Sequence, residues 1–90
     1  MSEEIDPLAA EYHYTQLADI LERRIRAGEF PPGLRLPAVM ALSEEYGAGT
    51  QTVRRALSIL RDRGLVVTVP ARGTFVVREL PASPSPAGDN

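Results

Sequence analysis

The segment TQTVRRALS at positions 50–58 combines hydroxyl, amide and guanidinium groups, all of which can donate hydrogen bonds to anions. Apolar residues recur there at spacings of three and four, which predicts a helix over about 50–63 with an inner face of Val53, Ala56, Leu57 and Leu60. Its opposite face carries Gln51, Arg54, Arg55 and Ser58, with Thr52 at the edge. Guanidinium groups pair with guanine or phosphate and amides pair with adenine. This face therefore has the chemistry of nucleic-acid recognition.

A second candidate group is the guanidinium of Arg72, in a four-residue turn with Pro70 and Gly73. The β-branched runs on either side, 65–69 and 74–77, predict an antiparallel hairpin. An arginine at the tip of a narrow hairpin can lie in or beside the minor groove of DNA. The alternative is an edge charge that prevents aggregation. We favour the DNA contact because the hairpin follows a basic helix.

Apolar spacing from Tyr14 predicts an earlier helix, which ends at Ala27-Gly28. The segment 29–37 is rich in Pro and Gly and is expected to be a rigid connector. Within it, Leu34 and Leu36 either pin the connector to the core or form a short strand.

A short helix is predicted from Pro37, with an apolar stripe of Val39, Leu42 and Tyr46. Met40 is expected to be partly buried beside that stripe. Only the turn 47–49, with glycine at both ends, separates this helix from the next, which predicts helix-turn-helix geometry. The predicted fold class is α+β, a winged helix-turn-helix with three helices followed by a two-stranded hairpin.

The 90 residues form one small domain, with 43% hydrophobic and 24% charged residues. We expect a flexible acidic arm over 1–11, the winged helix over 12–79 and a disordered Pro/Ser/Ala tail over 80–90. Neither a membrane span nor a signal peptide is visible, so we expect a cytoplasmic protein without a membrane partner.

Charge is distributed unevenly along the chain, although the net charge is only −2. Residues 46–78 carry six arginines against the single acid Asp62, whereas residues 1–45 carry four arginines against nine acids. The second half is therefore suited to phosphate, and the first half is not. The alternative for these arginines is a solvated helix face.

The composition disfavours an enzyme. There is no cysteine, and His13 is the single histidine, so neither a thiol nucleophile nor a zinc cage is available. Adjacent Glu44 and Glu45 diverge on a helix and are expected to be solvent charges. We predict no catalytic residue, no metal site and no cofactor.

Six separated motifs resemble the DNA-binding domain of GntR-type bacterial transcription regulators. They are Tyr14-x-Gln16-Leu17-Ala18, Ile25-x-x-Gly28, Pro32-Gly33-x-x-Leu36-Pro37, Thr52-Val53-Arg54-Arg55-Ala56-Leu57, Leu60-x-x-x-Gly64-Leu65 and Arg72-Gly73-Thr74-Phe75-Val76. The resemblance covers about residues 12–78. It implies a winged helix that reads operator DNA in the major groove, usually as a homodimer on a pseudo-palindromic site.

The expected DNA-binding residues are Thr50, Gln51, Thr52, Arg54, Arg55, Arg72 and Gly73. The chain departs from the family pattern at three places. Val39-Met40 replaces a usual Glu-Arg, Gly49-Thr50 replaces a Ser or Thr followed by Arg, and Ala71 replaces the wing-tip glycine. Each lost charge-assisted contact is worth about 1.5–3 kcal/mol, so we expect low affinity per monomer or an unusual operator.

Typical members of the family carry a large C-terminal domain that senses a metabolite, and only the tail follows here. No small-molecule effector pocket is therefore predicted, and Met1 favours a complete gene product. The leading hypothesis is a DNA-binding regulator, expected to be a repressor that occupies a promoter. The alternative is a winged-helix protein-interaction module that has lost operator binding and whose acidic first half binds a basic partner.

Overall fold

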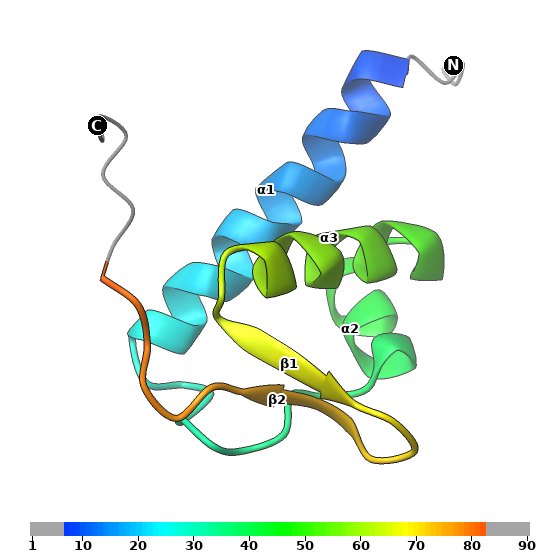
Figure 1. Cartoon of the computed structure of the whole chain (residues 1–90). Helices are drawn as coiled ribbons and strands as arrows, with labels where there is room; N and C mark the ends of the chain where they lie inside the picture. Colours follow the sequence, from blue (N-terminus) through cyan, green and yellow to red (C-terminus); the bar gives the residue numbers. More distant parts are fainter. Residues whose placement is uncertain (1–6, 83–90) are drawn as a thin grey trace.

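The computed structural model describes residues 7–82 (Figure 1). The elements in chain order are the helices α1 (Pro7–Arg26), α2 (Val39–Tyr46) and α3 (Thr50–Asp62), followed by the strands β1 (Val66–Val69) and β2 (Gly73–Val76). This order confirms the predicted α+β winged helix. Within the described residues, no helix combines the length and the apolar character that crossing a membrane requires.

Helix α1 begins at Pro7, well before the apolar periodicity that starts at Tyr14. The expectation of a flexible arm over 1–11 is therefore wrong for residues 7–11. Proline is favoured at the first helical position, and the Leu and Ala that follow have high helix propensity. Residues 1–6 lie outside the described residues, and there the arm stays a prediction.

The expected tail is also shorter than predicted. Leu80 packs partly buried against the core, and Arg26 donates from Nη1 to the carbonyl of Pro81 at 2.9 Å. The chain therefore stays attached to the body of the domain beyond residue 79. Residues 83–90 lie outside the described part of the chain, and disorder there stays a prediction.

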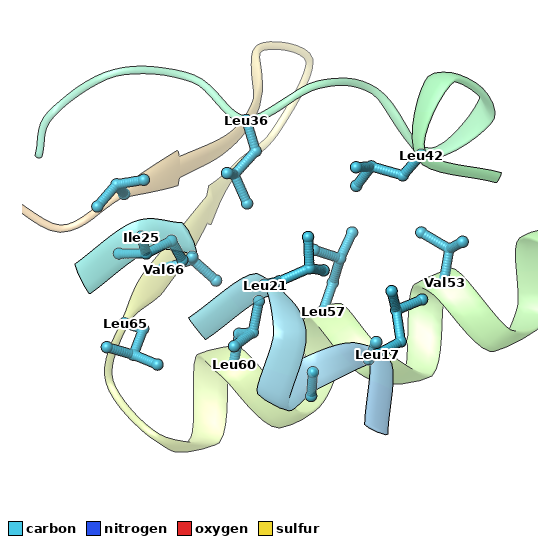
Figure 2. Close-up of a cluster of buried hydrophobic side chains, with 13 residues drawn as sticks. Leu17, Leu21, Ile25, Leu36, Leu42, Val53, Leu57, Leu60, Leu65 and Val66 are labelled. Atoms are coloured by element: carbon cyan, nitrogen blue, oxygen red, sulfur yellow. The ribbon is translucent and has the colours of Figure 1, made fainter. Parts of the chain in front are cut away.

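One hydrophobic core joins all the elements (Figure 2). Its buried residues are Leu17, Ala18, Leu21, Ile25, Leu36, Leu42, Val53, Ala56, Leu57, Leu60, Leu65, Val66 and Val76. The four residues predicted for the inner face of α3 are all among them. Burying a side chain of this size contributes about 1.5–3 kcal/mol, so this core fixes the exposed face of α3 relative to α1 and the hairpin.

Helix α2 begins at Val39, so Pro37 precedes the helix instead of opening it. The helix ends at Tyr46 and is capped by Gly47, whose N–H donates to the carbonyl of Ser43 and whose φ of 63° is left-handed. Met40 is 63% exposed, and the expectation of partial burial is wrong. It lies two positions from the buried Leu42, a rotation of about 200° around a helix, so the two residues face opposite sides.

Strands β1 and β2 form the predicted antiparallel hairpin, with Val66 opposite Val76 and Val69 opposite Gly73. Because Gly73 already pairs with Val69, the turn holds three residues (70–72) instead of the expected four. We call this hairpin with its turn, residues 66–76, the wing.

The connector lies alongside β2 and pairs with it at one isolated bridge, outside the two-stranded sheet. Arg35 pairs with Phe75 in an antiparallel bridge, and the N–H of Leu36 donates to the carbonyl of Thr74 at 2.8 Å. Leu36 is buried, while Leu34 remains 56% exposed. Leu36 thus pins the connector to the core, as one of the two alternatives expected, while the pairing with β2 is a single bridge and not a strand.

Candidate nucleic-acid interface

The N-terminal end of α3 presents unpaired backbone donors to solvent. The first hydrogen bond of the helix runs from the N–H of Val53 to the carbonyl of Gly49 at 3.1 Å. The N–H groups of Thr50, Gln51 and Thr52 precede that bond and have no partner within the helix. Gly49 supplies no side-chain cap. This end therefore offers both backbone donors and the helix dipole to an anion.

The predicted polar face of α3 is exposed to solvent. Gln51, Arg54 and Arg55 are exposed, and Thr50 and Thr52 are half-buried. Arg54 has neither an ion pair nor a cation–π contact with any residue of 13–82. Its guanidinium is therefore available to an external acceptor.

Arg55 is positioned differently from its neighbour. Its guanidinium lies 5.3 Å from the ring centroid of Tyr14, which makes a cation–π contact between α3 and α1. Adjacent residues on a helix diverge by about 100°, so Arg54 and Arg55 do not serve one acceptor together. Arg55 lies at the edge of the exposed face that is nearest α1.

The tip of the wing carries Arg72, which is exposed. Its backbone is held on one side by Ala71, at φ 66°, and on the other by Gly73, at φ 122°. Ala71 has the only positive φ of any non-glycine residue in the described chain. A left-handed conformation of this kind costs an alanine about 1–2 kcal/mol.

A groove of about 400 Å³ lies between the wing and the start of α2. Its lining includes Leu36 and Arg35 from the connector, Val39 from α2 and Arg72 from the wing. The wing tip and the helix-turn-helix therefore share one concave surface.

Arg35 also lines this groove, although it was not among the residues expected at the site. It donates from Nη1 to the carbonyl of Arg72 at 3.2 Å. The available signal was the alternation Leu34-Arg35-Leu36, which directs Arg35 away from the side on which Leu36 is buried.

Two arginines of the basic second half are engaged within the fold. Arg63 donates to Asp19 at 2.9 Å and to Glu22 at 2.8 Å, and Arg61 donates to the hydroxyl of Thr68 at 2.9 Å. Carboxylates therefore compensate the charge of Arg63, whereas Arg61 stays exposed and keeps its charge at the surface.

Arg24 forms the most connected polar cluster among the described residues. It donates to the hydroxyl of Tyr46 and, at 2.8 Å each, to Glu29 and Glu45, and it lies 4.5 Å from the ring centroid of Phe30. The hydrogen bond to Tyr46 and then that to Glu29 raise the pKa of Arg24 above its usual value. Glu45 is exposed, as expected, and also serves as an ion-pair partner. This cluster joins α1 to α2 and takes no part in the exposed face of α3.

The family model described as "Bacterial regulatory proteins, gntR family" matches residues 13–76. The HTH-type transcriptional repressor NagR of Bacillus subtilis is 40% identical over 63 residues, which are 70% of this chain and 26% of that protein. The Escherichia coli repressor MngR, of the mannosyl-D-glycerate transport/metabolism system, is 38% identical over 66 residues, which are 73% of this chain and 28% of that protein. The chain therefore spans about a quarter of the length of these curated relatives.

The fold is similar to that of the AraR DNA-binding domain in its crystal structure with operator ORR3. The two share 28% sequence identity with a TM-score of 0.69, and the match covers 86% of this chain and 87% of that one. A solved domain of the same architecture thus occurs in a complex with operator DNA.

Proposed function

Because the chain belongs to the gntR family of bacterial regulatory proteins, we propose that it is a sequence-specific DNA-binding transcriptional regulator that represses by occupying a promoter. The similarity to the operator-bound AraR domain supports this function. So do the repressors among its relatives. In this proposal the chain acts in the cytoplasm, without catalysis and without a cofactor.

The observation that carries the proposal is the exposed Arg54 beside the uncapped start of α3. A helix is about 10–12 Å across with its side chains, which fits a major groove about 12 Å wide. In that groove Gln51 pairs with adenine, and Arg54 pairs with guanine or a phosphate.

The remaining contacts surround these two. The hydroxyls of Thr50 and Thr52 donate hydrogen bonds to a phosphate, beside the free N–H groups at the start of the helix. Arg55 contacts the DNA backbone on the side of α3 that faces α1. Arg72 and Gly73 bring the wing to the adjacent minor groove or its phosphates. Two copies on a pseudo-palindromic site form a homodimer, as operator symmetry mirrors protein symmetry.

The test is a fluorescence-anisotropy titration of the chain with fragments of its host genome and with random duplexes at several salt concentrations. We expect a genomic fragment that binds more tightly than random DNA. Its log-log salt slope should be near −0.9 per phosphate contacted. Arg54→Ala should weaken that complex about tenfold or more.

Arg61→Ala is the matched control. It removes the same charge from the last turn of the same helix, about 10 Å along the axis from Arg54, so affinity should stay within about twofold of wild type. Absence of binding to any duplex in dilute buffer would refute the proposal and favour the protein-interaction module.

A further inference from the structure

Arg35 precedes the helix-turn-helix in the chain, yet it belongs spatially to the wing. It pairs with Phe75 of β2, and the adjacent hydrogen bond between Leu36 and Thr74 measures 2.8 Å. Directly opposed residues of antiparallel strands direct their side chains to the same face of the sheet. The backbone therefore places the side chain of Arg35 on the face that carries Phe75.

Gly73 makes room for that side chain. It lies two positions before Phe75, so it is on the same face of β2. A Cβ at position 73 would lie 3.0 Å from Cδ and 3.5 Å from Cγ of Arg35. The aliphatic part of Arg35 thus crosses directly over the glycine.

Beyond Gly73, the guanidinium of Arg35 reaches the wing tip. Its Nη1 donates to the carbonyl of Arg72 at 3.2 Å, and the side chain is exposed. A guanidinium has five N–H donors, so most of them remain after this one bond. No carboxylate within residues 13–82 forms an ion pair with Arg35 or with Arg72. Two cations without a carboxylate partner therefore meet at the wing tip, one from the turn and one from the connector.

We propose that Arg35 is both the positioning residue of the wing tip and a second phosphate contact beside Arg72. Its bond to the Arg72 carbonyl fixes the direction of the turn, and its remaining donors bind a backbone phosphate of double-stranded DNA. This inference rests on the proposed function, because it names an additional residue of the same interface.

The first experiment measures DNA affinity and salt dependence for Arg35→Ala and Arg35→Lys, by anisotropy, with the genomic fragment that the wild-type chain binds. Arg35→Ala should weaken binding about tenfold and reduce the magnitude of the salt slope by about one. Arg35→Lys keeps the positive charge, so its salt slope should match that of the wild-type chain. It should still lose affinity, because a single ammonium does not reproduce the fork that serves the carbonyl and a phosphate together.

Arg23→Ala is the matched control, because it removes an exposed arginine from α1, outside the wing. It should leave affinity within about twofold of wild type. Since all three substitutions are at exposed positions, thermal unfolding should confirm that each variant is folded.

The second experiment needs no DNA. In the free protein, Arg35→Ala should shift the backbone amide resonances of Arg72 and Gly73, and Arg23→Ala should not. A coupled substitution tests the contact itself. Gly73→Ala should weaken DNA binding by a larger factor in the wild-type background than in Arg35→Ala, because the added methyl displaces Arg35 only where it is present.

The outcomes separate the two claims. If the wild-type chain binds DNA and Arg35→Ala matches it in affinity and salt slope, the role of Arg35 is refuted and the proposed function stands. Unchanged Arg72 and Gly73 resonances refute the positioning role. If the wild-type chain binds no duplex in dilute buffer, the proposed function fails, and the phosphate contact fails with it.

Discussion

Arg63 donates to the carboxylate of Glu22 at 2.8 Å and thereby joins the C-cap of α3 to α1. Glu22 also accepts from Arg26 at 2.9 Å, and its side chain is only 12% exposed. The second partner of Arg63, Asp19, is 48% exposed. Glu22 is therefore the central acceptor of this network, and Asp19 lies at its edge.

This difference in exposure predicts unequal costs of removing the two carboxylates. Glu22→Ala should lower the free energy of unfolding by about 1.5–3 kcal/mol, because two partly buried guanidiniums each lose one charged acceptor. Asp19→Ala should cost less than about 1 kcal/mol, because its ion pair is largely solvated. Urea unfolding of both variants measures the difference, and equal losses would contradict the assigned roles.

Removal of Arg24 should destabilise the domain more than removal of its neighbour. Arg24→Met should cost about 2–3 kcal/mol, because it loses charge-assisted hydrogen bonds and a cation–π contact together. Arg23→Met changes an exposed residue on the same helix and should stay within about 0.5 kcal/mol of wild type. Thermal unfolding compares them, and a similar midpoint for the two variants would count against the cluster.

Ala71→Gly should stabilise the wing by about 0.5–1 kcal/mol, because glycine adopts the left-handed φ of 66° without the strain that alanine carries there. Ala27→Gly is the control. Position 27 has no positive φ, so glycine adds only disorder to the unfolded chain and should destabilise by a similar amount. The midpoint of chemical denaturation should therefore rise for Ala71→Gly and fall for Ala27→Gly. A shift of both midpoints in the same direction would be inconsistent with strain at Ala71.

Met40→Arg should strengthen DNA binding about tenfold. The resemblance to GntR-type regulators implies an arginine at position 40, and Met40 is 63% exposed on α2, so a longer cation meets no steric obstacle. Met40→Leu, which restores no charge, should leave the affinity unchanged. Anisotropy titrations with the genomic fragment measure both, and an equal affinity of the two variants would show that position 40 does not reach the DNA.

The helices and strands that pack into the core were the most predictable part of the fold. The inner face of α3 follows directly from the spacing of Val53, Ala56, Leu57 and Leu60, because those side chains are buried for the same reason that they are periodic. The start of α1 was missed because residues 7–11 are helical through propensity, without an amphipathic pattern. Met40 was misplaced because one apolar residue beside a short stripe does not define a face.

The part of the candidate site that lies on α3 was predictable from the sequence. The part that depends on contacts between different elements was less predictable. Arg54 and Gln51 are exposed, as the helical pattern predicts. The internal use of Arg63 and the approach of Arg35 to Arg72 both depend on contacts between residues far apart in the chain. Spacing along one element carries no information about such contacts.

The pairing of the connector with β2 also determines when the wing becomes ordered. Backbone hydrogen bonds from Gly33 and Leu36 to β2, at 2.9 and 2.8 Å, attach the hairpin to the segment that leads into α2. The loss of conformational entropy is thus incurred during folding and not on association. Such preorganisation favours slow dissociation of a bound partner, because little order is regained when the complex separates. Amide exchange at Gly33 and Leu36, whose N–H groups donate these bonds, should therefore be as slow as in α3, whether or not DNA is present.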